Sequence, residues 1–341
     1  MARTPDHGNG TGAHGRVVQR TDFVAAPWLP GPHLPTIWAS LCRRPPRLTP
    51  SFEHLDLPDG DFLELAWAGP ADAPVVIVLH GLEGSHGSSY ARALLAGLDA
   101  AGLRGVVLQF RGCSGRPNRL DRSYHSGDTG DLDYLVGLIE QRTGRPPCAV
   151  VGYSLGGNVT LKWLGERGAE APVKTAVAVS VPFDLGACAD YLNQGFSRLY
   201  QRRLVGSMRR KFASKFASRP APIDPGALHR LRSFRAFDDA ITAPLHGFRD
   251  AIDYYERASC RPFLRHIAVP TLIVHADDDP FVPSGAIPQA AELAPPVTLE
   301  LTRGGGHVAF LSGRVPWRSQ YWCEARILSH LLETITARPA A

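Results

Sequence analysis

The chain has 341 residues, of which 44% are hydrophobic, 20% charged and 9% aromatic. These are ordinary globular values, and they exclude an intrinsically disordered, collagen-like or coiled-coil protein. The net charge of +5 does not indicate a nucleic-acid-binding protein, because residues 191–223 alone carry eight basic and no acidic side chains and no nucleic-acid-binding motif accompanies them.

The N-terminal residues 1–22 lack the apolar stretch of a signal peptide, and we predict that they form a disordered segment. The longest aliphatic run, residues 75–79, is far shorter than the roughly 20 apolar residues of a membrane-spanning helix, so we expect no transmembrane segment. The six cysteines form no CxxC pair and show no zinc-ligand spacing, a pattern typical of a reducing compartment. We therefore predict a cytoplasmic protein.

Apolar strands alternate with amphipathic helices through most of the chain, which predicts a mostly parallel sheet covered by helices on both faces. A hairpin of two strands, 52–57 and 62–67, comes first and is expected at the sheet edge. The later strands are predicted at 75–79, 105–110, 148–153, 174–180, 271–275 and 297–301. The helices are predicted at 90–101, 131–142, 156–165 and 317–336.

About 90 residues separate the strand 174–180 from the strand 271–275, whereas a crossover between parallel strands needs only a dozen or more. This excess predicts a helical cap at 183–250, inserted after the sixth strand. Residues 23–182 and 251–341 are then the two parts of a single α/β core.

The sequence Gly152-Tyr153-Ser154-Leu155-Gly156 lies where an apolar strand ends and an amphipathic helix begins. In this strand–turn–helix context, a GxSxG sequence holds its serine on a tight turn at the sheet edge. The turn requires both glycines because a side chain there would collide with the neighbouring strand or helix. Ser154 is therefore the candidate nucleophile.

A serine hydroxyl becomes a good nucleophile only when a base removes its proton, and a carboxylate must orient that base. His307 follows three glycines just after the last predicted strand, and we assign it as the general base. The acid is expected after the preceding strand, where Asp277, Asp278 and Asp279 are consecutive. Asp279 is our assignment because the proline after it fixes its backbone, and Asp278 is the reserve.

The chain order Ser154, Asp279, His307 is that of α/β-hydrolases and differs from the orders of trypsin-like and subtilisin-like proteases. A metal site on the three aspartates is the alternative interpretation. Adjacent side chains point apart, however, and no second ligand cluster is evident, so we expect neither a metal nor a cofactor.

Acyl transfer to serine also needs hydrogen-bond donors for the oxyanion of the tetrahedral intermediate. The backbone N–H of Leu155, directly after the nucleophile, is the first candidate. The second is expected in the loop that follows the strand 75–79, and we assign it to the N–H of Leu82.

Several segments resemble the YheT-type branch of the α/β-hydrolase superfamily and its mammalian ABHD relatives. They are Pro32-His33-Leu34-Pro35-Thr36-Ile37, His80 to Gly84, Phe110 to Gly115, Tyr124-His125-Ser126-Gly127, the serine turn through Asn158, Asn193-Gln194-Gly195-Phe196-Ser197 and Gly306-His307. The resemblance covers roughly residues 23–335 and implies a serine hydrolase of carboxylic esters without a cofactor, with lipid esters among the substrates of some relatives. The first segment has Pro35 where the resemblance leads us to expect glutamine, and we assign no catalytic role to that segment.

Within the predicted cap, apolar residues recur every four positions, with arginines and lysines between them, which predicts an amphipathic helix over 196–216. The apolar positions are Phe196, Tyr200, Leu204, Met208, Phe212 and Phe216. We interpret this helix as a lid over the acyl pocket. Peripheral contact with an anionic membrane, and a solvated face without function, are the alternatives.

These observations predict a single α/β-hydrolase domain that hydrolyses small carboxylic esters, lipid-like ones included, through an acyl-enzyme on Ser154. A thioesterase or an acyltransferase with the same three residues is the alternative of the same class. A catalytically idle fold that binds a ligand or a membrane is the alternative from another class. Dehalogenases and epoxide hydrolases of this fold use an aspartate nucleophile, so Ser154 argues against them.

Overall fold

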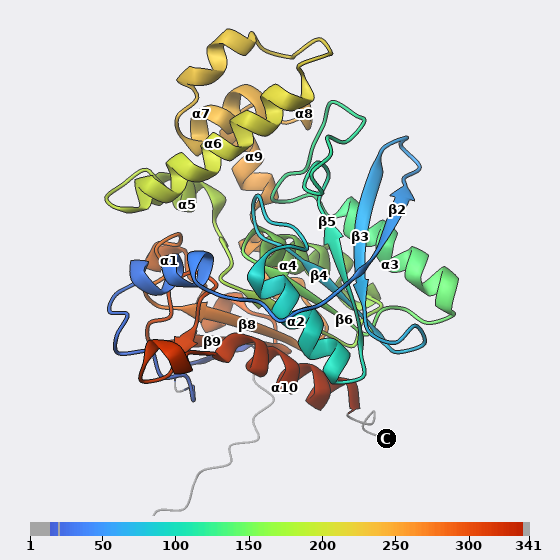
Figure 1. The fold of residues 1–341 in the computed structure, drawn as a ribbon, viewed down its shortest axis with the longest axis vertical. Helices are drawn as coiled ribbons and strands as arrows, with labels where there is room; N and C mark the ends of the chain where they lie inside the picture. The colour runs from blue at the N-terminus through green and yellow to red at the C-terminus, as the bar shows by residue number, and fades with distance from the viewer. Residues whose placement is uncertain (1–13, 20, 337–341) are drawn as a thin grey trace, which may run out of the picture.

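The computed structural model of the protein describes residues 14–19 and 21–336. Its centre is a nine-stranded sheet with the strand order β1-β9-β8-β7-β6-β4-β5-β3-β2 (Figure 1). The strands are β1 (Arg16–Val18), β2 (Ser51–Asp56), β3 (Phe62–Ala68), β4 (Val75–Leu79), β5 (Arg104–Gln109), β6 (Ala149–Tyr153), β7 (Thr175–Val179), β8 (Thr271–Ala276) and β9 (Val297–Thr302).

The strands β4 to β9 run parallel to one another. At one edge, β3 pairs antiparallel with β5 and β2 pairs antiparallel with β3, which is the predicted edge hairpin. Every residue of β4 is buried, as expected for a parallel strand that is covered on both faces. The predicted α/β fold class is confirmed.

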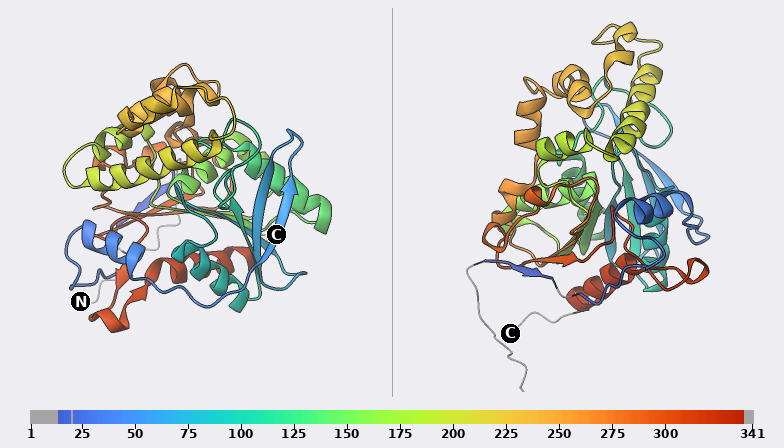
Figure 2. Two further views of the ribbon diagram at one scale, coloured as in Figure 1. Left: turned by 45° about the horizontal axis from the view of Figure 1, so that its top comes forward. Right: turned by 90° about the vertical axis from the view of Figure 1, so that its left-hand side faces the viewer.

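Helices cover both faces of this sheet (Figure 2). The four helices that do so are α2 (Ser89–Ala100), α3 (Gly130–Thr143), α4 (Leu155–Arg167) and α10 (Trp322–Thr336). Val76 and Val78 of β4 pack in one hydrophobic cluster with α2 and α10. Ile77 and Leu79 point the other way and pack with α3 and α4. This alternation fixes the register of the strand, because successive side chains point to opposite faces.

The prediction that residues 1–22 are disordered is wrong for residues 16–18. They form β1, which pairs in parallel with β9 at the open edge of the sheet. The edge of β9 leaves backbone groups unpaired, and even a three-residue strand satisfies several of them. Residues 1–13 and residue 20 lie outside the described part of the chain.

The helices between β7 and β8 lie together beyond the carboxyl ends of the parallel strands, apart from the helices that cover the two faces of the sheet (Figures 1 and 2). They are α5 (Leu185–Leu192), α6 (Ser197–Lys215), α7 (Phe234–Phe237), α8 (Ala243–Leu245) and α9 (Ala251–Ala258). Their hydrophobic cluster also touches Leu82 and Phe281, in the loops that follow β4 and β8. It includes Tyr254 and Tyr255 of α9, so these helices extend beyond the predicted boundary at residue 250.

The C-terminal helix α10 begins at Trp322 rather than at the predicted residue 317. A short 3-10 turn at Pro316–Arg318 and the pairing of β11 (Gln320–Tyr321) with β10 (Leu311–Ser312) occupy the intervening residues. Among the described residues, no helix combines the length and apolar character that crossing a membrane requires.

Candidate active site

Ser154 lies on the turn between β6 and α4, with φ at 51° and ψ at −117°. A positive φ is unfavourable for a residue with a side chain, so the surroundings must hold it. The Ser154 N–H donates to the carbonyl oxygen of Val179 at 2.8 Å. A Cβ at position 152 would overlap the Gly156 carbonyl oxygen, and a Cβ at position 156 would lie 2.5 Å from that of Leu79. Both glycines of the turn are therefore sterically required.

His307 lies between Ser154 and Asp279 and is within hydrogen-bond distance of both. Its Nε2 is 2.9 Å from Ser154 Oγ, and its Nδ1 is 2.8 Å and 3.0 Å from the two carboxylate oxygens of Asp279. With the proton on Nδ1, the neutral imidazole donates to Asp279 and accepts from the serine hydroxyl. The Asp279 side chain is buried, which strengthens its interaction with the imidazole.

The three consecutive aspartates have different partners. Asp277 Oδ1 accepts a hydrogen bond from the Gly304 N–H at 2.7 Å, and Asp278 Oδ1 accepts one from the Gly306 N–H at 2.9 Å. Burial raises the pKa of Asp278. Asp277 and Asp278 thus hold the loop that leads to His307, and the structure brings Asp279 alone of the three into contact with the imidazole.

The N–H groups around Leu82 are already bonded to protein acceptors. Those of Gly81, Glu83 and Gly84 donate to Tyr90 Oη (2.8 Å), Tyr124 Oη (3.0 Å) and the Gly81 carbonyl oxygen (2.9 Å). Within the described residues, the Leu82 N–H has no such acceptor. Leu82 and Leu155 both border the same cavity as Ser154 and His307, so both N–H groups remain candidates for the oxyanion site.

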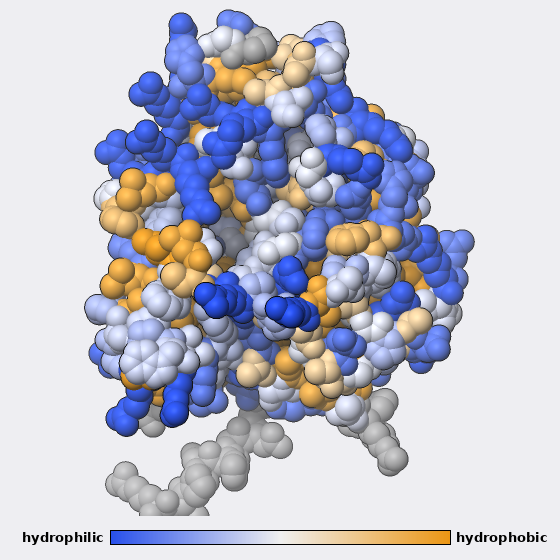
Figure 3. Space-filling model, viewed as in Figure 1, coloured by the Kyte–Doolittle hydropathy of each residue, from blue (hydrophilic) through white to orange (hydrophobic). Residues whose placement is uncertain are grey.

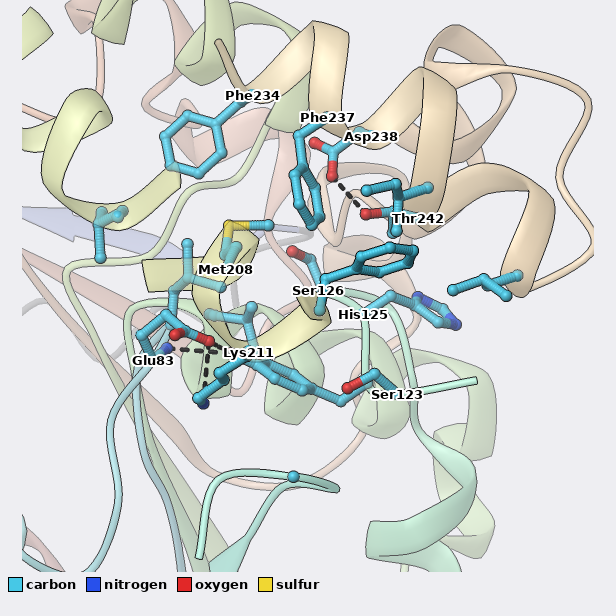
Figure 4. A pocket seen from close by; sticks show the side chains of 18 of the residues that line it. Glu83, Ser123, His125, Ser126, Met208, Lys211, Phe234, Phe237, Asp238 and Thr242 are labelled. Carbon is cyan, nitrogen blue, oxygen red and sulfur yellow. Dashed lines mark hydrogen bonds and ion pairs between the residues drawn. The ribbon is translucent and has the colours of Figure 1, made fainter. Parts of the chain in front are cut away.

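A polar cluster beside Leu82 was not predicted from the sequence. Lys211 Nζ of α6 lies 3.0 Å from Glu83 Oε1 and donates to Cys113 Sγ at 3.2 Å (Figure 4). The Tyr124 hydroxyl donates to the same Glu83 oxygen at 3.1 Å. Burial lowers the pKa of Lys211, but Cys113 and Glu83 outweigh that effect and raise it. The helical period indicates this position of Lys211, because a residue seven positions after Leu204 lies on the apolar face of α6.

A cavity of about 280 Å³ lies between Ser154 and the cap helices. Its apolar wall comes mainly from the cap: Leu204, Met208 and Phe212 of α6, and Phe234 and Phe237 of α7. Its polar wall includes Ser123, His125 and Ser126 (Figure 4). The lining suits a substrate with an apolar chain and a polar end.

A buried carboxyl group, that of Asp238, also borders this cavity. It accepts hydrogen bonds from Thr242 Oγ1 at 2.6 Å and from Tyr255 Oη at 2.7 Å. Burial nevertheless raises its pKa to about 6. The cap end of the cavity therefore changes charge near that pH.

Comparison with protein families gives one match that spans most of the chain. The model of the alpha/beta hydrolase fold matches residues 74–314. The chain belongs to this family. The resemblance to its YheT-type branch is also confirmed, by similarity to YheT of Escherichia coli (strain K12), a protein named as an esterase. That protein is 46% identical over 312 residues, which are 90% of this chain and 92% of YheT.

Phospholipase ABHD3 of Mus musculus is 31% identical over 313 residues, covering 85% of this hydrolase and 75% of the relative. Among solved structures, the esterase PF2001 of Pyrococcus furiosus covers 86% of this hydrolase with a TM-score of 0.55 and 16% identity, and 97% of that chain is matched. The structural likeness shows the fold alone. The sequence relatives place this hydrolase among α/β-hydrolases of the esterase and lipase type.

Proposed function

We propose that this hydrolase cleaves carboxylic esters through a covalent acyl-enzyme on Ser154. The single observation that supports this most is the position of His307, with one ring nitrogen at the serine hydroxyl and the other at a buried carboxylate. This arrangement activates a serine nucleophile in enzymes of several unrelated folds.

In the first half of the reaction, Ser154 Oγ attacks the ester carbonyl carbon while His307 Nε2 takes the serine proton. Asp279 stabilises the imidazolium that forms, and the N–H groups of Leu82 and Leu155 donate to the oxyanion. The intermediate then collapses. The carbon–oxygen bond to the alcohol breaks, and the alcohol leaves with the proton that His307 returns.

In the second half, water attacks the acyl carbonyl carbon and gives its proton to His307. The second tetrahedral intermediate expels Ser154 Oγ, which takes the proton back, and the carboxylic acid is released. None of these steps calls for a metal or an organic cofactor, because proton transfer and oxyanion stabilisation are supplied by the chain's own groups.

Lipid-like esters are the proposed substrate class. The apolar cavity wall under α6 accepts an acyl chain, while the polar wall near Ser123 and Ser126 accepts the end that carries hydroxyl or charged groups. The name of the relative phospholipase ABHD3 supports a lipid substrate. Acylglycerols belong to this class because they combine a long acyl chain with a small polar alcohol.

A fluorophosphonate probe tests the proposal directly, because it labels only a serine whose hydroxyl is activated. We expect the label on Ser154 in the wild type and no label in Ser154→Ala or His307→Ala. An unlabelled wild-type protein would instead favour a fold that binds ligands without catalysis. Matched esters and thioesters with one acyl chain, with and without an alcohol acceptor, separate the esterase from the thioesterase and acyltransferase alternatives.

Peripheral contact with an anionic membrane is a second candidate function, and the two ends of α6 differ in a way that favours it. Met208 and Phe212 border the cavity, as a lid requires, but Leu199 and its neighbour Phe196 are 54% and 46% exposed. In Figure 3, which has the view of Figure 1, orange apolar residues gather at the left, over α5 and the adjacent end of α6, and blue hydrophilic residues lie beside them. Arg198, Arg202 and Arg203 are exposed around Leu199, and within the described residues none of them forms an ion pair with a carboxylate.

Exposed apolar and unpaired cationic side chains together are the combination that binds anionic lipid surfaces. A cytoplasmic location is compatible with such contact. It is supported by the cysteines, all six of which are free thiols.

A further inference from the structure

The segment Pro32-His33-Leu34-Pro35-Thr36, to which we assigned no catalytic role in the sequence analysis, leads into the short helix α1 (His33–Leu41). In the fold, this segment lies against the loop that carries His307, although 271 residues separate Thr36 from His307 along the chain.

Thr36 contacts the backbone of the candidate base directly. The His307 N–H donates to Thr36 Oγ1 at 2.9 Å, and the Thr36 hydroxyl donates to the Pro32 carbonyl oxygen at 2.8 Å. Since the hydroxyl proton is directed to Pro32, an oxygen lone pair is left for the N–H of His307. Thr36 is only 8% exposed, so water does not readily replace this bond.

The two segments approach so closely that only glycine fits between them. Gly306 has φ at +64°, and a Cβ there would lie 2.5 Å from Thr36 Oγ1 and 2.7 Å from the Pro32 carbonyl oxygen. The same segment thus meets both the residue before His307 and His307 itself.

A second set of contacts reaches the imidazole ring. His33 Nδ1 lies 3.2 Å from the hydroxyl of Tyr200 in α6, and the Tyr200 ring lies 4.9 Å from that of Phe281. Phe281 in turn stacks on the His307 ring, with centroids 4.0 Å apart and planes inclined by 13°. A chain of contacts therefore runs from His33 through two aromatic rings to the face of the imidazole.

The His307 loop needs support from outside because its own backbone is strained. Val308 and Phe310 have φ at 56° and 41°, values that cost free energy for residues with bulky side chains. Such a loop keeps its conformation only where the surrounding structure determines it. The Val308 N–H has one such partner in Ser180 Oγ at 2.9 Å, and Thr36 provides the one at His307.

We propose that the segment Pro32–Thr36 positions the catalytic histidine: Thr36 holds the backbone of His307, and His33 holds its ring through Tyr200 and Phe281. The proposal rests on the function proposed above. Thr36 and His33 act through other residues and touch neither substrate nor reacting atoms. Small displacements of a catalytic group are costly, since a misplacement of about 1 Å can reduce the rate by about 100-fold.

Thr36→Val and Thr36→Ser form the central test. Valine keeps the shape of threonine but cannot accept a hydrogen bond, whereas serine keeps the hydroxyl. We expect kcat for a soluble ester to fall by up to about 100-fold in Thr36→Val with KM unchanged, and to stay close to wild type in Thr36→Ser. Thr175→Val is the matched control, because it removes another buried hydroxyl whose partners are Pro270 and His330.

A proton NMR signal provides a readout that does not depend on turnover. The Nδ1–H of His307, bonded to Asp279, is expected as a downfield resonance in the wild type, in Thr36→Ser and in Thr175→Val. In Thr36→Val we expect it to broaden or disappear. Tyr200→Phe removes only the hydroxyl that His33 binds, so its kcat should fall by less than that of Thr36→Val.

A Thr36→Val variant that melts at a lower temperature but keeps both kcat and the resonance would overturn the proposal, since Thr36 would then only stabilise the fold. Wild-type kcat in Tyr200→Phe would overturn the part assigned to His33. If the proposed function is wrong, the outcome differs from these: Ser154→Ala would retain activity, while Thr36→Val would still change the His307 resonance.

Discussion

Lys211 of α6 and Glu83 of the loop after β4 form an ion pair, with Nζ 3.0 Å from Oε1. One interaction therefore joins the cap to the loop that carries a candidate oxyanion donor, the N–H of Leu82. Glu83 has φ at 59°, and its side chain is only 7% exposed. A residue with an unusual backbone conformation, next to Leu82, is thus paired with a charge from the cap.

We expect Lys211→Met to lower kcat by roughly tenfold, less than the 10²- to 10³-fold loss that follows removal of a whole oxyanion donor. The Glu83 carboxylate would lose its cation, and the loop would relax away from the conformation that aims the Leu82 N–H. Stability should fall by about 1–3 kcal/mol. Arg210→Met is the matched control because Arg210 is exposed on the same helix. Equal kinetics in the two variants would argue against this coupling.

Ser154→Ala and His307→Ala should each lower kcat by about six orders of magnitude, with an unchanged circular dichroism spectrum. Asp279→Asn should cost on the order of 10⁴ in kcat by favouring the wrong imidazole tautomer. Asp278→Asn should cost far less, because an amide oxygen can still accept from Gly306. Steady-state kinetics on one soluble ester rank the four variants, and the reverse order of the two aspartates would move the role to Asp278.

Asp238 should make the stability of the protein depend on pH. Burial raises its pKa from 3.8 to about 6 in the folded state, so the folded state binds this proton more tightly than the unfolded chain. The free energy of unfolding from this group is therefore greatest below pH 3.8 and falls as the pH rises through about 6. Melting temperatures of the wild type and of Asp238→Asn, compared from pH 4 to 7, measure the effect. Parallel curves for the two proteins would contradict it.

Filling the cavity should shorten the preferred acyl chain. Met208 borders the apolar wall, and Met208→Trp adds volume there without adding charge. We expect kcat/KM for long-chain p-nitrophenyl esters to fall while that for acetate stays near wild type. Leu199→Trp, on the exposed side of the same helix, is the control. A uniform loss across chain lengths would mean that the acyl chain lies elsewhere.

Binding to vesicles tests the membrane candidate, with Ser154→Ala as the background so that lipid turnover does not interfere. We expect co-sedimentation with anionic but not with zwitterionic vesicles, and weakening by salt. Each basic residue near such a surface contributes about 1 kcal/mol, so replacing Arg198, Arg202 and Arg203 by glutamine should weaken binding by roughly 100-fold.

The control for that experiment replaces three exposed arginines outside the cap, Arg145, Arg265 and Arg303, by glutamine. It makes the same change in net charge. If both triple variants bind equally, the interaction depends on net charge and the α6 surface is not the binding site.

The parts of the fold that the sequence predicts well are those determined by local pattern. Residues 75–79 are entirely apolar because both faces of β4 are covered, and the serine turn requires its glycines for steric reasons that need no knowledge of the rest of the chain. The strand β1 has no such pattern. Its three residues form a strand because they lie beside the open edge of β9, which only the folded structure reveals.

The candidate site likewise contains residues that the sequence predicts and residues that only the folded structure reveals. Chain order and spacing led to Ser154, Asp279 and His307, and the structure brings these three side chains together. Thr36 could not be found by those means, because it acts across a contact between segments 271 residues apart. Spacing could place Lys211 on the apolar face of α6, but it could not reveal its partners Glu83 and Cys113, which lie about 100 or more residues earlier. Long-range pairs of this kind leave little trace in local composition.

The bond between Thr36 and His307 has a consequence for how the protein matures in the cell. The first helix must wait for a partner that the ribosome adds 271 residues later, which takes on the order of tens of seconds at about 5–20 residues per second. Tyr200 is translated earlier, but until His307 follows, α1 lacks the loop that it packs against. Ester hydrolysis by the proposed mechanism therefore cannot begin before His307 has been translated, and a nascent chain that already displays Ser154 is still harmless to the esters around it.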